Sequence, residues 1–229
     1  MKNIKIIVTD LDNTLLRTDK TISDYTAGIL NKCRHNGIKI VFATARQERN
    51  TANFTDRITP DVVISTNGAK VSANGQTILL KHIRPSAVKD IADDLLRNDF
   101  IFIIDYESYA LTNDKDYLSW AGSGWGVMFT DFTEYGLKCA QRISIKDQGE
   151  KAASLIDFDK YGCRIYASQG AVWYAISEKS VSKLTSVETS ARHFGCNLSA
   201  VISFGDDYND IEMLKEAGLA LPYLMPLTK

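Results

Sequence analysis

Short runs of branched apolar residues recur in the first part of the chain, and a polar segment follows each run. They occupy residues 4–8, 38–43 and 61–65. Runs of this length and composition are typical of strands that are buried on both faces of a sheet. Between the first two runs, Ser23 predicts the N-cap of a helix that Gly37 ends. A polar stretch over residues 47–56 has helical character. This alternation predicts a parallel sheet with helical crossovers.

The pattern changes after the third run. Asn74-Gly75 lies between two strand-like segments and predicts a hairpin turn. A helix is predicted next, followed by four further strand-like segments, over residues 85–97, 100–105, 140–145, 163–167 and 172–176. We therefore expect residues 82–178 to form an inserted α+β cap domain.

The opening pattern returns at the end of the chain. A helix, a buried strand, a short helix and a last strand are predicted over residues 182–194, 200–204, 209–217 and 219–221. Residues 1–81 and 179–229 would then form one core domain. The predicted fold class is α/β, with a Rossmann-like parallel sheet in the core and a cap domain inserted into it.

The composition disfavours some classes of function but does not indicate a particular one. The 229 residues are 45% hydrophobic and 24% charged, with a net charge of -1, which is ordinary for a globular protein. This balance does not favour binding to nucleic acid or to a membrane surface, and no apolar run is long enough to span a bilayer. The four cysteines are scattered, so we expect buried free thiols in a cytoplasmic protein. We expect a monomer or a weak homo-oligomer.

Two acidic residues follow the first predicted strand directly, in the segment Thr9-Asp10-Leu11-Asp12-Asn13-Thr14. Ligands of parallel sheets bind beyond the carboxyl ends of the strands. If the extended geometry continues, Asp10 and Asp12 point the same way, and their repulsion favours a hard divalent ion such as Mg²⁺ between them. Asp and Asn also form turns readily, so this segment alone leaves both interpretations open.

Other polar residues lie at the ends of neighbouring elements. Thr44 follows the second strand, where its hydroxyl suits a phosphate oxygen or the N-cap of a helix. Lys183 lies in the first turn of a predicted helix, where its charge opposes the helix dipole, so a nearby anion explains it better than a structural role. The third strand ends in Thr66-Asn67-Gly68-Ala69, which alone predicts only a turn.

Three carboxylates follow the fourth strand, in Gly205-Asp206-Asp207-Tyr208-Asn209-Asp210. Helix capping by Asp207, with Asp210 in the first turn, explains part of this cluster. Asp206 is better explained as a metal ligand. The acids, the threonine and the lysine would all converge on one edge of the sheet. Such a set suits a phosphoryl group, whose charge must be neutralised during transfer.

These motifs resemble those of a known family. With Asp10-x-Asp12-x-Thr14, Thr44, Lys183 and Gly205-Asp206-x-x-Asn209-Asp210 in this order, the chain resembles the haloacid dehalogenase superfamily, and within it the Cof-type phosphatases with an α/β cap. The resemblance implies that Asp10 is a nucleophile that becomes an aspartyl-phosphate, and that Asp12 acts as acid and then as base. It also implies that Thr44, Lys183 and Asn209 bind the phosphate.

The same resemblance implies a Mg²⁺ cofactor. Its site would comprise Asp10, the backbone carbonyl of Asp12, Asp206 and Asp210, the last of these orienting the ligand shell. We therefore expect an Mg²⁺-dependent phosphatase that hydrolyses small phosphorylated metabolites, sugar phosphates in particular. A phosphomutase or phosphotransferase on the same scaffold, and a catalytically impaired phosphate-binding protein, remain alternatives.

The sequence departs from the family pattern in two places. Ala45 stands where the family usually has Gly, and we expect a slightly altered phosphate loop. Residues 222–229 do not resemble the strand and helix with which the family continues. We expect this to affect the coverage of the sheet edge, while every residue with an implied catalytic role is present.

Overall fold

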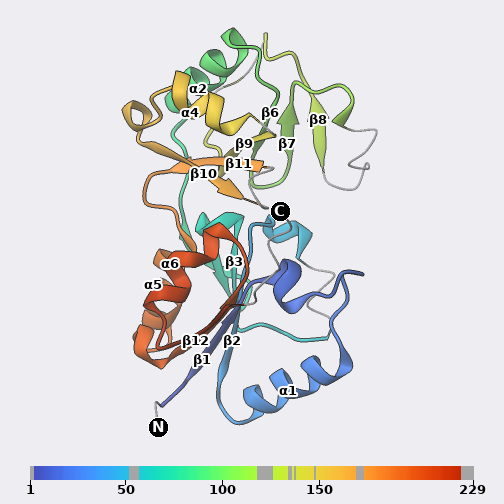
Figure 1. The fold of residues 1–229 in the computed structure, drawn as a ribbon, viewed down its shortest axis with the longest axis vertical. Coiled ribbons are helices and arrows are strands. Elements are labelled where there is room, and N and C mark those ends of the chain that lie inside the picture. The colour runs from blue at the N-terminus through green and yellow to red at the C-terminus, as the bar shows by residue number, and fades with distance from the viewer. Residues whose placement is uncertain are drawn as a thin grey trace. The chain divides into compact units, whose positions relative to one another are not determined.

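The protein is described by a computed structural model that covers residues 3–51, 57–117, 126–133, 136, 138–146, 148–168 and 173–222. The chain divides into two compact units, one of Met1–Leu80 with Val181–Lys229 and one of Lys81–Ser180. We call these the core unit and the cap unit. Because the core unit contains both the first and the last part of the chain, the cap unit is an insertion (Figure 1).

The core unit is built around a seven-stranded sheet with the order β13-β12-β1-β2-β3-β4-β5 (Figure 1). Its strands are β1 (Ile6–Thr9), β2 (Lys39–Ala43), β3 (Val62–Ser65), β4 (Lys70–Ala73), β5 (Gln76–Leu80), β12 (Val201–Gly205) and β13 (Leu219–Pro222). Neighbouring strands from β13 to β3 are parallel, whereas the β3–β4 and β4–β5 pairs are antiparallel. The predicted parallel sheet is confirmed, and the hairpin at Asn74-Gly75 extends it at one edge.

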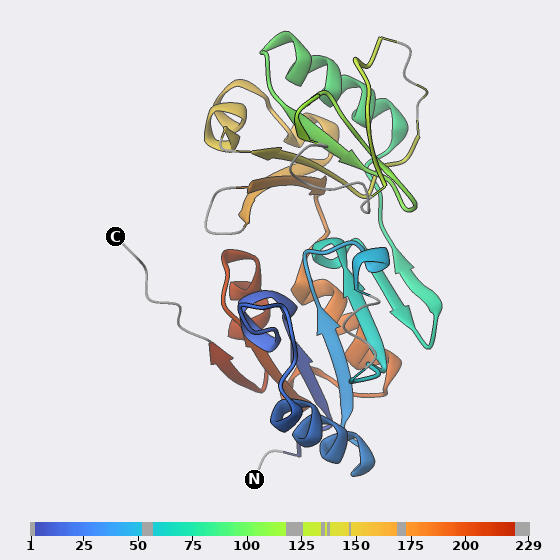
Figure 2. The ribbon, with the colours of Figure 1, turned by 90° about the vertical axis from the view of Figure 1, so that its right-hand side faces the viewer.

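Helices cover both faces of this sheet (Figure 2). They are α1 (Asp24–His35) on one face, and α5 (Lys183–His193) and α6 (Ile211–Glu216) on the other. Successive residues of β1 point to opposite faces. Ile6 and Val8 pack in the same cluster as Val187 of α5, and Ile7 packs in the same cluster as Leu30 of α1. Burial on both faces therefore explains the continuous apolar run of β1.

Serine caps begin two of these helices, of which the sequence predicts the one at Ser23. Ser23 Oγ accepts a hydrogen bond from Thr26 N at 3.0 Å before α1, and Ser182 Oγ accepts one from Thr185 N at 3.1 Å before α5. Each cap satisfies a backbone N–H that has no partner within its helix. The second cap fixes the start of α5, and with it the backbone of Lys183, the first residue of this helix.

A tight turn, Thr66–Gly68, follows β3, and its three residues have φ values of 50°, 56° and 101°. A Cβ atom on Gly68 would lie 2.2 Å from the carbonyl oxygen of Ser182, and Ser186 Oγ donates a hydrogen bond to the Gly68 carbonyl at 2.8 Å. The missing side chain therefore lets this turn pack directly against the start of α5. The turn and the helix that carries Lys183 are held together by these contacts.

The cap unit contains a six-stranded sheet with the order β10-β11-β9-β6-β7-β8. Its strands are β6 (Phe102–Asp105), β7 (Ala110–Thr112), β8 (Val127–Phe129), β9 (Arg142–Lys146), β10 (Cys163–Ser168) and β11 (Trp173–Glu178). All neighbouring pairs except β7–β8 are antiparallel. Two helices, α2 (Pro85–Arg97) and α4 (Gly149–Leu155), pack on one face of the sheet, where Ile91, Leu95 and Ala152 join one apolar cluster with Ile104.

Some elements differ from the sequence expectation. The short elements β7, β8 and α4 were not predicted, because three to seven residues carry little periodic pattern. Of the helix predicted over residues 47–56, the described residues form a single turn, Glu48–Asn50, and residues 52–56 lie outside the described chain. All four cysteines are free; Cys163 is buried as predicted, but Cys139 is exposed. Among the described helices, none has the length and apolar character needed to cross a membrane.

We expect Gly68→Ala to lower the free energy of unfolding by about 3 kcal/mol or more, because the added methyl group meets the Ser182 carbonyl at a left-handed backbone position. Gly75→Ala is the matched control: Gly75 also has a positive φ, but no atom lies within 4 Å of its added Cβ. Its loss should be about 1 kcal/mol. Urea denaturation measures both values, and equal losses would show that the turn does not pack closely against α5.

Candidate functional site

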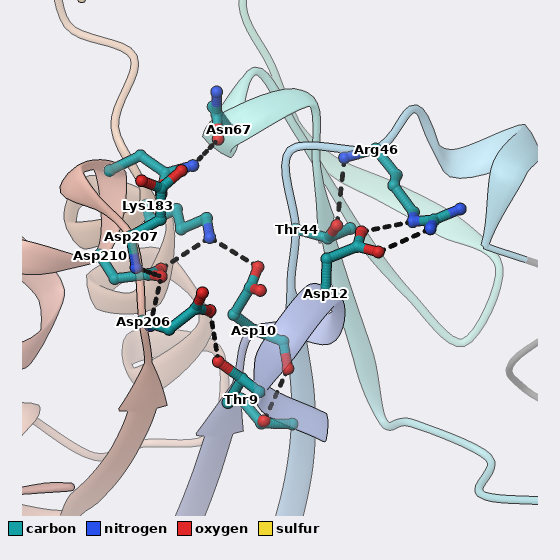
Figure 3. Close-up of polar contacts among 12 residues, drawn as sticks. Thr9, Asp10, Asp12, Thr44, Arg46, Asn67, Lys183, Asp206, Asp207 and Asp210 are labelled. Atoms are coloured by element: carbon teal, nitrogen blue, oxygen red, sulfur yellow. Dashed lines mark hydrogen bonds and ion pairs between the residues drawn. The ribbon is translucent and has the colours of Figure 1, made fainter. Parts of the chain in front are cut away.

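Asp10 lies directly after β1, at the carboxyl edge of the core sheet (Figure 3). The residue is 6% exposed, and its carboxylate accepts a hydrogen bond from Lys183 Nζ at 2.7 Å. Lys183 Nζ donates a second hydrogen bond to Asp210 Oδ1 at 2.6 Å, and the Lys183 side chain is 1% exposed. One buried ammonium group therefore bridges two buried carboxylates, and this explains a lysine in the first turn of a helix.

The pKa values of these groups reflect burial and crowding. Burial raises the pKa of Asp10 to about 7, against the opposing effect of the Lys183 ammonium, and the neighbouring Asp210 carboxylate raises it further. Burial acts to lower the pKa of Lys183, but the charges of Asp10 and Asp210 outweigh it, so this pKa is raised. The lysine is therefore charged, and the protonation of Asp10 depends on what else binds near it.

A third carboxylate completes the cluster. Oxygen atoms of Asp10, Asp206 and Asp210 lie within 4.8 Å of one another. Thr14 Oγ1 donates a hydrogen bond to Asp206 Oδ1 at 2.7 Å, and partial burial raises the pKa of Asp206. Three carboxylates face one ammonium group, so the cluster has an excess of negative charge. This donor set suits a hard divalent cation.

Asp210 has a different part in the cluster from the other two acids. Its Oδ2 accepts hydrogen bonds from the backbone N of Asp206 at 3.1 Å and of Asp207 at 3.2 Å, while its Oδ1 accepts from Lys183. A Cβ on Gly205 would lie 2.5 Å from the Asp210 carboxyl carbon, so only glycine leaves room for this carboxylate. Both oxygens of Asp210 are thus engaged. One oxygen each of Asp10 and Asp206 makes no hydrogen bond within the described chain.

Asp207 caps the turn that follows β12. Its Oδ1 accepts a hydrogen bond from Tyr208 N at 2.8 Å, and it forms a capping box with Asp210. The capping interpretation of Asp207 is confirmed. The neighbouring Asp206 lies instead in the acidic cluster, so the two adjacent aspartates have separate roles.

Asp12 lies outside the acidic cluster. The chain does not continue as a strand after Asp10; it turns over Leu11–Leu15, where Leu16 N donates to Leu11 O at 2.7 Å. The Asp12 carboxylate accepts two hydrogen bonds from Arg46, from Nε at 2.6 Å and from Nη2 at 2.7 Å (Figure 3). The turn explains why the carboxylates of Asp10 and Asp12 have different partners.

Two cationic side chains stabilise the ionised form of Asp12. Lys20 Nζ adds a hydrogen bond to Asp12 Oδ1 at 2.8 Å. Partial burial would raise the pKa of Asp12, but the hydrogen bonds from Arg46 and Lys20 outweigh it and lower the pKa. Asp10 and Asp12 therefore have pKa values that are shifted in opposite directions, although only one residue separates them.

Thr44 is buried at the end of β2, close to Arg46 (Figure 3). Its Oγ1 accepts a hydrogen bond from Arg46 N at 3.1 Å, so it stabilises a turn rather than capping a helix. Within the described chain, its hydroxyl hydrogen has no acceptor, which leaves it available to an anion. Ala45, at the position where glycine was expected, does not have a positive φ. The backbone of this loop therefore tolerates a side chain at residue 45.

Asn209 approaches the turn after β3. Its Nδ2 donates a hydrogen bond to Asn67 Oδ1 at 2.6 Å. Asn67 has no predicted role in the sequence analysis, and neither do Thr14, Lys20 and Arg46. Thr14 and Asn67 lie inside the segments Thr9–Thr14 and Thr66–Ala69, and Arg46 follows Thr44 by two residues, but the contacts of all three join distant segments that residue spacing cannot reveal. The structure thus brings together Asp10, Lys183, Asp206 and Asp210, and gives Asp12, Thr44 and Asn209 places at the edges of the site.

Comparison with known proteins gives a consistent result. A family model described as haloacid dehalogenase-like hydrolase matches residues 7–221. A protein of Buchnera aphidicola subsp. Baizongia pistaciae that is named only as a phosphatase is 27% identical over 227 residues, which cover 93% of this chain and 84% of the relative. A 5-amino-6-(5-phospho-D-ribitylamino)uracil phosphatase of Bacillus subtilis is 24% identical over 241 residues, covering 93% and 84%.

The fold also matches a solved structure. The chain is similar to the HAD subclass IIB sugar phosphatase BT4131, with a TM-score of 0.80, 23% sequence identity, and coverage of 95% of this chain and 86% of that chain. At this identity the similarity concerns the fold. It extends over both units, because the matched part includes nearly the whole chain.

The raised pKa of Asp10 predicts a pH dependence of stability in the metal-free protein. The folded protein holds the Asp10 proton up to about pH 7, whereas the unfolded chain loses it near the ordinary value of 3.8. The stability contributed by Asp10 therefore falls as the pH rises through this window. Asp10→Asn has no proton to lose, so its stability relative to the wild type should rise with pH, by about 1 kcal/mol for each pH unit within this window.

Urea denaturation in the presence of a chelator, at several pH values, measures this difference. Asp24→Asn, at an exposed aspartate in α1, serves as the control and should track the wild type. A stability difference between Asp10→Asn and the wild type that does not change with pH would contradict the raised pKa.

Proposed function

The chain belongs to the haloacid dehalogenase-like hydrolase family, as a phosphatase of the Cof type, and we propose that it hydrolyses phosphate monoesters of small metabolites, sugar phosphates in particular, through an aspartyl-phosphate on Asp10. One observation carries this proposal: the buried Asp10 carboxylate, directly after β1, shares the Lys183 ammonium with Asp210 and forms an acidic cluster with Asp206 and Asp210. The names of the two phosphatases with stated substrates support the substrate class, since one concerns a phosphorylated ribityl compound and the other a sugar phosphate.

In the first half of the proposed reaction, an Asp10 oxygen attacks phosphorus and the bond to the ester oxygen breaks. The departing alkoxide takes a proton from Asp12. In the second half, Asp12 accepts a proton from the water that attacks the aspartyl-phosphate, and Asp10 and inorganic phosphate are released. Each half has a lower barrier than direct hydrolysis.

The contacts of Asp12 fit the second half of this scheme directly. Both of its oxygens accept hydrogen bonds from Arg46, which suits a carboxylate that acts as a base. For the first half, Asp12 must release Arg46 and take up a proton. The anionic substrate is a competing partner for this guanidinium, since Arg binds phosphate oxygens in the same bidentate manner as carboxylates.

Phosphate binding is proposed for Thr44, Lys183 and Asn209. The Thr44 hydroxyl hydrogen is available, and Lys183 provides a buried positive charge beside the nucleophile. Asn209 contributes amide N–H groups from the turn Tyr208–Asp210, which precedes α6. These donors come from three different elements, so a phosphoryl group between them would be contacted from several sides.

The proposed cofactor is Mg²⁺. Asp10 and Asp206 each have an oxygen available as a ligand, the backbone carbonyl of Asp12 would add a third, and Asp210 would orient the ligand shell through its hydrogen bonds. The ion would supply positive charge against the phosphoryl oxygens. The acidic cluster supports this proposal, because one lysine does not balance three carboxylates.

Asp10→Asn should lower the hydrolysis of p-nitrophenyl phosphate by about 10³-fold or more, since an amide oxygen is not a competent nucleophile here. The measurement is steady-state release of p-nitrophenol with Mg²⁺. Asp207→Asn is the matched control: it lies in the same loop, but it caps a turn, and Asn caps as well as Asp does. Activity that survives Asp10→Asn would contradict the covalent mechanism.

Asp206→Asn should raise the Mg²⁺ concentration needed for half-maximal activity by about 10- to 100-fold, because one charged ligand is lost. Titration of a chelator-treated enzyme with Mg²⁺ measures this shift, and Asp207→Asn again provides the control. An unchanged Mg²⁺ requirement in Asp206→Asn would argue against a metal ligand at this position.

A further inference from the structure

The turn after β3 places one side chain beside the proposed phosphate ligands. Asn67 N donates a hydrogen bond to the carbonyl oxygen of Thr44 at 3.0 Å, and the next residue, Gly68, packs against Ser182. These contacts fix the backbone of Asn67 between the loop of Thr44 and the helix of Lys183. Asn67 has a φ of 56°, a left-handed conformation that Asn adopts more readily than most residues. Figure 3 shows its side chain on the same side of the site as Lys183.

The side chains of Asn67, which is buried, and Asn209, which is half-buried, form an amide pair with an incomplete set of hydrogen bonds. Asn209 Nδ2 donates to Asn67 Oδ1 at 2.6 Å. Asn67 Nδ2 and Asn209 Oδ1 are both buried, and within the described chain neither has a hydrogen-bond partner. The Asn209 amide has two N–H groups, and within the described chain only one of them has an acceptor. Turning both amides over exchanges donor and acceptor and still leaves one NH₂ group and one oxygen without partners.

An incomplete set of this kind is unfavourable unless a ligand completes it. A buried polar atom without a partner destabilises a protein, so each such atom in a native structure needs an explanation, for example a bound molecule. Asn67 is 2% exposed, so bulk water does not satisfy it. The pair lies beside the loop of Thr44, where the proposed function places the phosphoryl group.

Charge balance explains why the site needs these neutral donors. Two of the three N–H groups of Lys183 already donate to carboxylates, which leaves one for a phosphate dianion. A dianion next to Asp10 and Asp206 is repelled unless further donors contact it. An amide N–H group is such a donor, and it must be held in one orientation to contribute fully, since an unrestrained side chain loses conformational freedom on binding.

We infer that Asn67 is a positioning residue for phosphate binding: its side-chain amide holds that of Asn209, so that an N–H group of the pair faces a phosphoryl oxygen. This inference rests on the proposed function, which makes Asn209 a phosphate ligand. Asn67 acts through Asn209, so its effect disappears when the Asn209 side chain is absent.

A double-mutant cycle of Asn67→Gly and Asn209→Ala tests this coupling. Glycine keeps the left-handed backbone of residue 67 without strain. The readouts are kcat and KM for p-nitrophenyl phosphate with Mg²⁺, and the calorimetric affinity for inorganic phosphate. Asn67→Gly should lower kcat/KM and phosphate affinity about 10-fold in the wild-type background, and less than about 3-fold in the Asn209→Ala background. Asn74→Gly is the matched control, an exposed left-handed asparagine in the β4–β5 hairpin, and should leave both readouts unchanged.

Losses of equal size in both backgrounds would overturn the inference, because Asn67 would then act independently of Asn209. No loss in Asn67→Gly would overturn it as well. If the glycine variant does not fold, Asn67→Ser, whose side chain is too short to reach Asn209, replaces it in the same cycle. A wild-type protein that does not hydrolyse p-nitrophenyl phosphate would count against the proposed function, and the cycle would then be evaluated from inorganic phosphate binding alone.

Discussion

The contact on which the site depends is the pair of short hydrogen bonds from Lys183 to Asp10 and Asp210. All three side chains are almost completely buried, and an unpaired charge in such a place is unfavourable by several kcal/mol. The contact is therefore a constraint more than a source of stability. It requires the end of β1, the start of α5 and the turn after β12 to meet at one point of the sheet edge. The serine cap of α5 and the small volume of Gly205 both serve this requirement.

The sequence predicted the core well and the site in outline. Strands such as β1 and β2 are buried on both faces, so their apolar runs are unmistakable, and the carboxyl ends of such strands must lie together. The contacts between residues within the site could not be predicted in this way. Lys183 is 173 residues from Asp10 and 27 from Asp210, and the separation of Arg46 from Asp12 is 34 residues. Periodicity specifies which face a residue occupies, but long-range pairing depends on turn geometry and rotamers.

The turn Thr66–Gly68 illustrates what a local pattern cannot reveal. Taken alone, the four residues after β3 predict a simple turn. In the structure, three successive positive φ values are held in place by contacts with the loop of Thr44 and with the start of α5. Backbone conformations of this kind persist only where the surroundings determine them. The turn thus connects two parts of the site that the strand order alone would leave independent.

The surroundings of the two aspartates in the first motif shift their pKa values in opposite directions. Burial favours the neutral form of Asp10, whereas Arg46 and Lys20 favour the ionised form of Asp12. The proposed chemistry begins from the opposite assignment, with an ionised nucleophile and a protonated acid. A divalent cation beside Asp10 and Asp206 favours ionised Asp10, and a phosphate that draws Arg46 away removes a major influence that keeps Asp12 ionised. The two proposed ligands, a divalent cation and a phosphate, would therefore bring both carboxyl groups into their reactive forms.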